Sequence, residues 1–180
     1  MVAALSRTQP RETPESRATD VRSRFLEGFR RTAGSVTVVT TDGIAGRFGQ
    51  TATAAMSVSA DPPTLIVGLF RGVPVAEAVT TNGVFALNVL AADDVQIAHD
   101  FSGQSTQASR YKFGESWGAL RTGSPVRLTA SATFDCHVER FLSAGSHMLI
   151  LGRVVEVHTN DVQSLTYSNR NYGIHVPFVR

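Results

Sequence analysis

The chain has 180 residues, of which 42% are hydrophobic and 18% are charged, a composition typical of one globular domain with a full core. This composition excludes a disordered chain, and no apolar run approaches the roughly 20 residues that span a bilayer. The net charge is only +2, and residues 32–180 hold ten basic and eleven acidic side chains. Because that part is nearly neutral, we expect no nucleic-acid partner, and because no apolar run is long enough, we expect no membrane.

The N-terminal segment differs in composition from the rest of the chain. Residues 1–20 are rich in Pro, Thr, Ser and Arg, which predicts a disordered basic tail, with the folded domain at residues 21–180. This tail has no apolar segment typical of a secretory signal. The single cysteine, Cys136, permits no internal disulfide, so we expect a cytoplasmic protein.

Hydrophobic periodicity predicts more strands than helices. A first helix is expected from Asp20 to Gly34, because Val21, Phe25, Leu26 and Phe29 share one face. Further helices are expected over 75–80, ending at Gly83, and from Asp93. Strands are expected over residues 36–41, within 49–61, and over 64–70, 84–90, 130–141 and 147–158. The pattern predicts a mainly β fold, a barrel or curled sheet with peripheral helices. Residues 102–128 predict a long loop, usually a functional or mobile feature.

The common catalytic motifs are missing from the sequence. Gly43, Gly46 and Gly49 recur at every third position, but a strand follows them instead of the helix of a dinucleotide-binding fold. The five histidines lack the spacing of zinc ligands, so no metal is expected. Cys136 lies within a predicted strand, where a small core residue is the simpler interpretation. The chemistry of an enzyme without such groups is typically carried by a cofactor.

Five motifs in order resemble the short flavin reductases, the NAD(P)H-dependent partners of two-component flavin monooxygenases. The motifs are FRRTAGSVTVVTT (29–41), GQTATAAMSVSADPP (49–63), GVFALNVL (83–90), DCHVER (135–140) and AGSHMLILGRV (144–154). The resemblance covers about residues 24–173. It implies an FMN-binding split β-barrel of six strands with peripheral helices, usually a homodimer.

The resemblance also implies where a flavin binds. Small side chains at Ala52 and Ala54, beside Gln50, would let the flat isoalloxazine ring approach the backbone. Backbone N–H groups and the hydroxyls of Thr51 and Thr53 would then bond the polar edge of the ring, including N5 and O4, and stabilise the charge that develops there.

Further contacts follow from the same resemblance. Ser57, Ser59 and Pro62 would shape the ribityl side of the site, although Met56 replaces a second Ser of the family. The segment of Phe70, Arg71, Gly72 and Val73 would meet the phosphate, with Phe70 in place of the family's Asn. His147 would contact the nicotinamide, although Ser146 replaces the Asp of the family's Gly-Asp-His. Weaker matches are Phe101, Arg110 and Tyr172.

The function implied is NADH-dependent reduction of free flavin, FAD or FMN with FAD favoured, by direct hydride transfer to N5 without a side-chain acid or base. Reduced flavin would then pass to a separate monooxygenase. Two alternatives stay open: a flavin-binding storage or sensor module without activity, and a split-barrel oxidase of a small metabolite. The second needs a basic phosphate-binding cluster, which the single Lys112 and the near-neutral charge do not favour.

Overall fold

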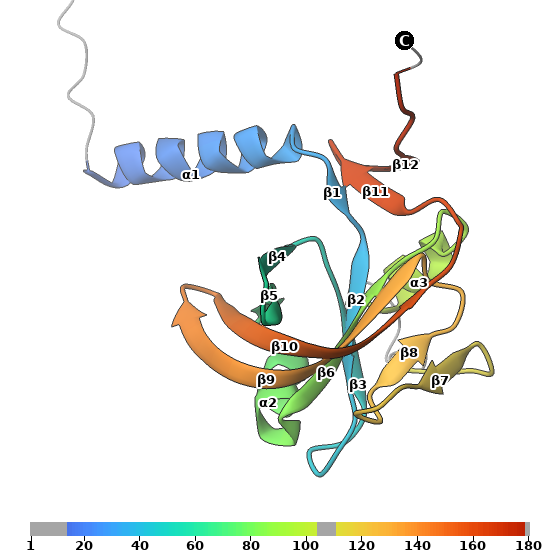
Figure 1. The fold of residues 1–180 in the computed structure, drawn as a ribbon. Helices are drawn as coiled ribbons and strands as arrows, with labels where there is room; N and C mark the ends of the chain where they lie inside the picture. The colour runs from blue at the N-terminus through green and yellow to red at the C-terminus, as the bar shows by residue number, and fades with distance from the viewer. Residues whose placement is uncertain (1–13, 104–110, 179–180) are drawn as a thin grey trace, which may run out of the picture. The chain divides into compact units, whose positions relative to one another are not determined.

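The computed structural model describes residues 14–103 and 111–178, with side chains described from residue 19 onward. The chain divides into two compact units, Met1–Thr32 and Ala33–Arg180. The first contains helix α1 (Pro14–Arg30), which begins at Pro14 and not at Asp20 (Figure 1). Residues 14–20 are therefore helical, contrary to the expected disordered tail. The remainder of that predicted tail lies outside the described residues.

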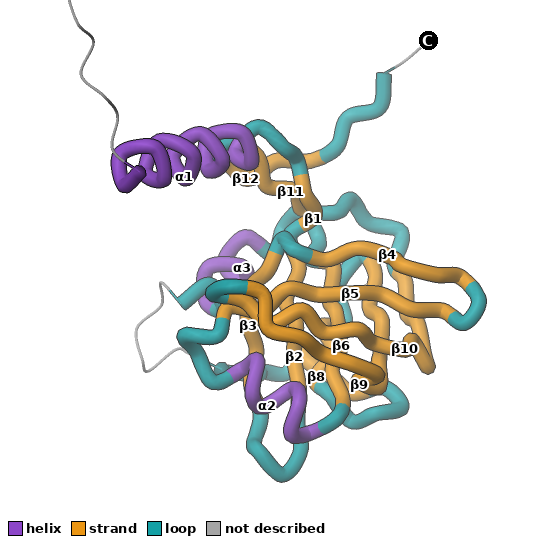
Figure 2. The backbone as a smooth tube through the Cα atoms, turned by 90° about the vertical axis from the view of Figure 1, so that its left-hand side faces the viewer, coloured by secondary structure: helices purple, strands orange, loops and turns teal. Residues whose placement is uncertain are grey.

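The second unit is mainly β with short peripheral helices, as predicted (Figure 2). Its elements are, in chain order, β1 (Gly34–Ser35), β2 (Thr37–Thr41), β3 (Phe48–Ala52), β4 (Ala55–Ala60), β5 (Pro63–Phe70), α2 (Val75–Asn82), β6 (Val84–Val89), α3 (Val95–Asp100), β7 (Trp117–Ala119), β8 (Pro125–Arg127), β9 (Ala132–Ala144), β10 (His147–Thr159), β11 (Leu165–Ser168) and β12 (Asn171–Ile174). Gly83 ends α2 in the left-handed conformation, with φ of 71°, which confirms its predicted capping role. Over the described residues, no helix is both long and apolar enough to cross a bilayer.

Seven antiparallel strands form a split barrel. Their order is β3-β2-β6-β9-β10-β5-β4, so β3 and β4 lie at opposite edges of the sheet although they are neighbours in sequence. Only Thr53 and Ala54 connect them, and the sheet must therefore curl until its two edges meet. The Gly68 N–H donates to the Ala54 carbonyl over 2.7 Å and holds this crossing against β5. The barrel is thus closed by the chain itself and not by hydrogen bonds between β3 and β4.

The crossing explains why the structure has seven barrel strands where six were expected. The single strand predicted within residues 49–61 is two strands, because the chain leaves the edge of β2 at Thr53 and joins the edge of β5 at Ala55. Little space is available at this point, since a Cβ atom placed on Gly68 would lie 3.1 Å from the Cβ of Ala54. The small residues of this stretch therefore permit a tight backbone crossing.

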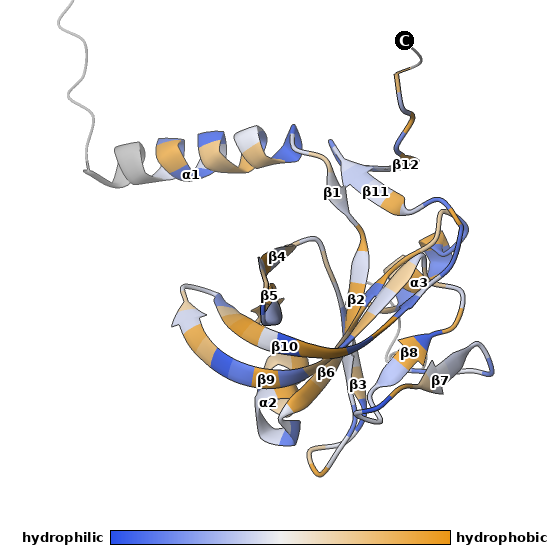
Figure 3. Ribbon diagram, viewed as in Figure 1, coloured by the Kyte–Doolittle hydropathy of each residue, from blue (hydrophilic) through white to orange (hydrophobic). Residues whose placement is uncertain are grey.

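Strand β2 is buried on both faces and separates two hydrophobic clusters. Val39 points into the barrel with Phe85 and Ile150, whereas Val38 packs with Phe101 and others on the opposite face. Figure 3 shows apolar stretches along β2, β6 and β10, which supply much of the barrel interior. Each fully buried side chain of this size contributes about 1.5–3 kcal/mol to folding.

Two segments contain strands that the sequence did not predict. The C-terminal residues form the β11–β12 hairpin, which pairs with β1 in a three-stranded sheet. The segment expected to be a long loop contains the hairpin of β7 and β8, although residues 104–110 are not among those described. Both hairpins lie beside α3, because the second cluster joins Leu165 and Trp117 to Ala98 and Phe101.

Candidate functional site

Two adjacent cavities follow the free edge of β3. The first, of 390 Å³, is lined by Val36, Thr51, Ala52, Thr53, His99, Ser102, Tyr167, Arg170 and Tyr172. The second, of 250 Å³, is lined by Gly49, Gln50, Phe70, Val73, Asp100, Phe101, Ser102, Gly103 and Tyr111. Ser102 belongs to both, and the consecutive residues 49–53 pass from one to the other. Together we call these two cavities the β3 groove.

The register of β2 determines which backbone groups face the groove. The Leu90 N–H donates to the carbonyl of Val36, the residue just before β2. Val38 and Thr40, which follow Val36 at alternate positions, therefore turn their peptide groups toward β6. The intervening residues turn toward β3, where Thr37 pairs with Ala52. Thr51 and Thr53 therefore direct their own peptide groups away from β2. The Thr51 N–H bonds the Phe101 carbonyl, while the Thr53 N–H has no backbone acceptor among the described residues.

Thr51 fastens α3 to the edge of β3. Its N–H donates to the Phe101 carbonyl over 2.9 Å, and its Oγ1 donates to the Ala98 carbonyl over 2.8 Å. These bonds satisfy two carbonyls at the C-terminal end of the helix. Gly49 allows the close approach, because a Cβ there would lie 2.6 Å from the Phe101 ring. Both donors of Thr51 are thus used by α3, whereas the Thr53 N–H has no backbone acceptor among the described residues.

A buried polar and aromatic network supports α3 from behind. The Phe101 ring packs against Phe113 and Trp117, with centroid distances of 5.3 Å and 5.4 Å. Arg127 and Asp94 form an ion pair at 2.7 Å in which both side chains are largely buried. Asp94 directly precedes α3, so this pair fixes the start of the helix to β8. The network therefore holds the helix that presents His99 and Ser102 to the groove.

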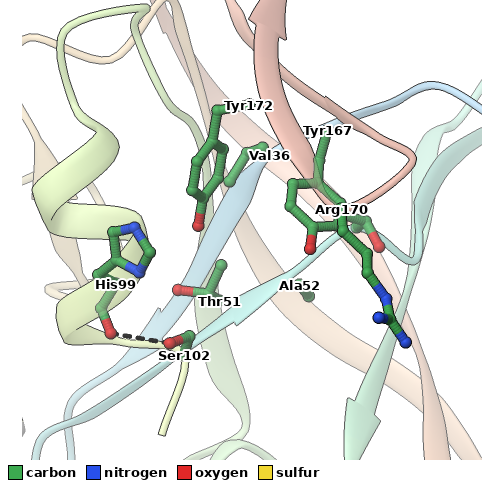
Figure 4. A pocket seen from close by; sticks show the side chains of 9 residues that line it. Val36, Thr51, Ala52, His99, Ser102, Tyr167, Arg170 and Tyr172 are labelled. Atoms are coloured by element: carbon green, nitrogen blue, oxygen red, sulfur yellow. Dashed lines mark hydrogen bonds between the residues drawn. The ribbon is translucent and has the colours of Figure 1, made fainter. Parts of the chain in front are cut away.

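Aromatic side chains form one end of the groove. The rings of Tyr167 and Tyr172 lie 5.2 Å apart, and the His99 ring meets Tyr172 edge-on at 5.2 Å. Figure 4 shows these three side chains around Thr51 and Ala52. Burial, and secondarily the neighbouring Tyr167, raises the pKa of the Tyr172 phenol. The phenol therefore stays protonated at neutral pH and is able to donate a hydrogen bond.

At the other end of the groove, His147 lies beside the segment that was expected to bind phosphate. Strand pairing sets His147 opposite Phe70, with their ring centroids 5.7 Å apart. The Phe70 ring lies over Gly72, where a Cβ would be only 2.2 Å from it. The Arg71 N–H donates to the Ser146 carbonyl over 3.0 Å, and Ser146 Oγ lies 3.0 Å from His147 Nδ1. The turn after β5 is thus tied to the β9–β10 turn.

The structure gathers most, but not all, of the residues predicted for the site. The groove is lined by Gln50, Thr51, Ala52, Thr53, Phe70, Val73, Phe101 and Tyr172, and next to these residues in the chain or the sheet lie Ala54, Arg71, Gly72 and His147. Ser57 and Ser59 instead line a separate, largely apolar cavity of 300 Å³ with Met56 and Val157. Ser59 Oγ is also bonded within the turn at Asp61. Arg110 is in the part of the chain that is not described.

Sequence reasoning missed several groove residues. His99, Ser102, Tyr167 and Arg170 all line the larger cavity. Tyr167 and Arg170 come from the C-terminal hairpin. The sequence Tyr-Ser-Asn-Arg-Asn-Tyr weakly indicates such a hairpin, because Asn favours a short hairpin turn and an aromatic residue lies on each side of it. His99 and Ser102 carry no sequence signal, because only the docking of α3 on Thr51 brings them to the groove.

The groove offers hydrogen-bonding groups suited to the edge of a flavin ring. Gln50 Oε1 is buried without a hydrogen-bond partner in the described part of the chain, and such an orphaned acceptor is costly unless a ligand satisfies it. The free Thr53 N–H supplies a donor a short distance along the same strand. The isoalloxazine edge carries both carbonyl acceptors and an N–H donor, so the two groups fit it. No cluster of three or more His, Cys, Asp or Glu suited to a metal occurs among the described residues.

The fold and the site together are a split barrel with two adjacent cavities along the free edge of β3. The family model described as "Flavin reductase like domain" matches residues 29–174. The chain therefore belongs to the flavin reductase family of oxidoreductases, as its motifs predicted.

Three known proteins illustrate the similarity. FMN reductase (NADH) RutF of Agrobacterium fabrum is 38% identical over 164 residues, which cover 91% of either chain. BorF, the flavin reductase component of a bacterial two-component tryptophan halogenase, superposes with a TM-score of 0.76 at 30% identity, over 84% of this chain and 97% of its own. The NADH:FAD oxidoreductase SgcE6 of Streptomyces globisporus, solved with NAD and FAD fragments, gives a TM-score of 0.78 at 25% identity, over 88% and 94%.

Proposed function

We propose that the chain reduces free FMN with NADH and releases reduced flavin to a separate flavin-dependent monooxygenase. The observation that carries this proposal is the β3 groove, where small side chains, an outward-facing N–H of Thr53 and the unpartnered Gln50 Oε1 lie on one strand edge. Direct hydride transfer from the nicotinamide to flavin N5 supplies the redox chemistry. The protein therefore has to bind and orient two substrates, and no side-chain acid or base is required.

We assign a separate ligand contact to each of several residues in or beside the groove. We propose that the Thr53 N–H bonds the polar edge of the ring, where a donor stabilises the negative charge that reduction brings. We propose that the Gln50 amide, whose Oε1 is buried without a partner among the described residues, bonds the pyrimidine edge of the ring. Arg71, with the amides at Gly72 and Val73, is proposed to hold the flavin phosphate. His147 is proposed to contact the nicotinamide, because its ring lies against Phe70 at the same end of the groove.

Two expectations change in light of these observations. We leave Ser57 and Ser59 out of the proposed flavin site, because they line a different cavity and Ser59 is bonded within a turn. We also propose FMN in preference to FAD. The support is the FMN reductase from Agrobacterium, which is more similar in sequence to this chain than the FAD-reducing protein from Streptomyces.

A homodimer is proposed from the outer face of the barrel. The register aligns Met56 of β4 with Ile66 of β5 and Leu151 of β10, and it sets Leu149 of β10 opposite Leu142 of β9. Because residues two apart in a strand share a face, these five side chains form one apolar stripe. Met56 and Leu142 are more than half exposed. Apolar patches of this kind commonly mark protein interfaces.

The oxygenase partner is proposed from the two-component relative. BorF is the flavin reductase component of a two-component tryptophan halogenase, and its fold covers 84% of this chain. The chemistry requires only that the partner consume reduced flavin. A groove with open edges, in place of an enclosed cofactor cavity, agrees with reversible flavin binding.

A steady-state assay tests the proposed function. NADH and NADPH are each combined with FMN, FAD and riboflavin, and nucleotide oxidation is followed at 340 nm. We expect turnover with NADH, and the highest kcat/KM with FMN. Flavin binding without turnover would instead indicate a storage or sensor module, and oxidation of a small metabolite without nucleotide would indicate an oxidase.

A further inference from the structure

The β11–β12 hairpin has an unusual residue at its tip. Ser168 pairs with Asn171, so Asn169 and Arg170 form a two-residue loop. Both adopt positive φ, 48° and 64°, which is the pattern of a type I′ turn. Asn is common at the first of these positions, but the second usually holds Gly, because a left-handed conformation costs other residues about 1–2 kcal/mol. The chain keeps an arginine where glycine would relieve this strain.

The side chain of Arg170 offers a reason for the strained backbone. It lines the larger cavity of the β3 groove, and within the described residues it makes no ion pair or hydrogen bond. His99 is the other basic residue of that lining, and no carboxylate is among the nine residues that line this cavity. Figure 4 shows Arg170 and His99 on opposite sides of Thr51 and Ala52. An unpaired guanidinium in such a cavity favours an anionic ligand.

Of the two arginines considered for the groove, only Arg170 lines a cavity, the larger one. Arg71, proposed above for the flavin phosphate, follows Phe70, which lines the smaller cavity. A flavin mononucleotide carries one phosphate group and satisfies one of these cations. The dinucleotide substrate carries a pyrophosphate, and a guanidinium binds such oxygens through paired, charge-assisted hydrogen bonds.

We propose that Arg170 binds the pyrophosphate of the reduced pyridine dinucleotide and so contributes to the affinity for NADH. The inference rests on the proposed function, because it assumes that the nucleotide enters the same groove as the flavin. The alternative source of the same chemistry is the flavin phosphate. Arg170 acts only in binding, and hydride transfer itself does not require it.

The variant Arg170→Gly tests this role without endangering the fold. Asn-Gly is the preferred sequence for this turn, so the melting temperature should stay the same or rise. We expect the KM for NADH to increase roughly 10-fold or more, the loss typical of a charge-assisted bond, with kcat little changed. Arg121→Gly is the matched control, since it removes an exposed arginine in a turn away from the groove. It should leave both constants unchanged.

Substrates without phosphate identify which group Arg170 contacts. If it binds the pyrophosphate, Arg170→Gly should not affect the KM for dihydronicotinamide riboside, and the ratio of KM values for FMN and riboflavin should stay constant. A selective rise in the KM for FMN would overturn the assignment in favour of the flavin phosphate. Equal KM values for NADH in the variant and the wild type would overturn it altogether.

A binding measurement separates this inference from the proposed function. Calorimetric titration of the wild type and Arg170→Gly with NAD⁺ requires no turnover. If the wild type binds NAD⁺ but oxidises no NADH with any flavin, the proposed function fails, while weaker binding by the variant still supports Arg170. Equal affinity in both proteins, or no NAD⁺ binding by the wild type, contradicts the role of Arg170.

Discussion

Replacing Thr51 with valine should both destabilise the protein and weaken flavin binding. Valine keeps the volume of threonine and suits a strand, so the change removes little except the hydroxyl. The lost bond is the 2.8 Å contact from Oγ1 to the carbonyl of Ala98, a residue that is fully buried. An acceptor left unsatisfied in such surroundings costs about 1–3 kcal/mol. The same bond holds the end of α3 that carries Ser102, so the KM for flavin should rise together with the loss of stability.

Urea unfolding and flavin titration measure the two effects separately. Thr53→Val is the matched control for stability, because Thr53 is exposed and its hydroxyl makes no hydrogen bond in the described structure. Its free energy of unfolding should stay within about 0.5 kcal/mol of the wild type. The reasoning is refuted if Thr51→Val is as stable as the wild type, or if both variants lose the same amount.

Three further predictions concern other parts of the second unit. Asp94→Ala leaves the guanidinium of Arg127 buried and unpaired, and should cost about 3–5 kcal/mol in urea unfolding; an unchanged midpoint would contradict this. Burial, and secondarily the Asp135 carboxylate, raises the pKa of the Cys136 thiol, so a thiol reagent should react only after unfolding. Because the unfolded thiol ionises first, stability should fall above about pH 8.5, by at most about 1.4 kcal/mol per pH unit for this group, and Cys136→Ala should lack that component. Met56→Lys places a charge on the apolar stripe of the proposed homodimer interface and should shift sedimentation of the proposed dimer toward monomer; an unchanged dimer would contradict this interface.

Hydrophobic patterns predicted those strands whose sequence fits only one kind of secondary structure. The continuous apolar run of β5 was predicted because its burial leaves a direct record in the sequence. The long strands β9 and β10 were also predicted, although most of their residues are not buried. The division between β3 and β4 was not predicted, since Thr53 and Ala54 fit a continuous strand as well as a crossing. The crossing depends on a contact with Gly68, and such a long-range contact leaves no local signal.

The candidate site was also predicted only in part, because it too depends on contacts between segments that are distant in the sequence. The resemblance identified the stretch from Gln50 to Thr53, but it assigned ligand contacts to the Thr51 donors, which the structure commits to α3. His99 and Arg170 come from distant parts of the chain and line one cavity only because α3 is held by Thr51 of β3 and the hairpin pairs with β1. Periodicity describes one segment at a time and does not report which segments become neighbours.

A crystal structure with FMN bound tests most directly whether the free edge of β3 is the flavin site. We expect density for the isoalloxazine ring against residues 49–53, with a ring acceptor within hydrogen-bond distance of the Thr53 N–H and the Gln50 amide at the pyrimidine edge. Density for the ring in the separate cavity beside Met56, or anywhere away from β3, would contradict the proposed site.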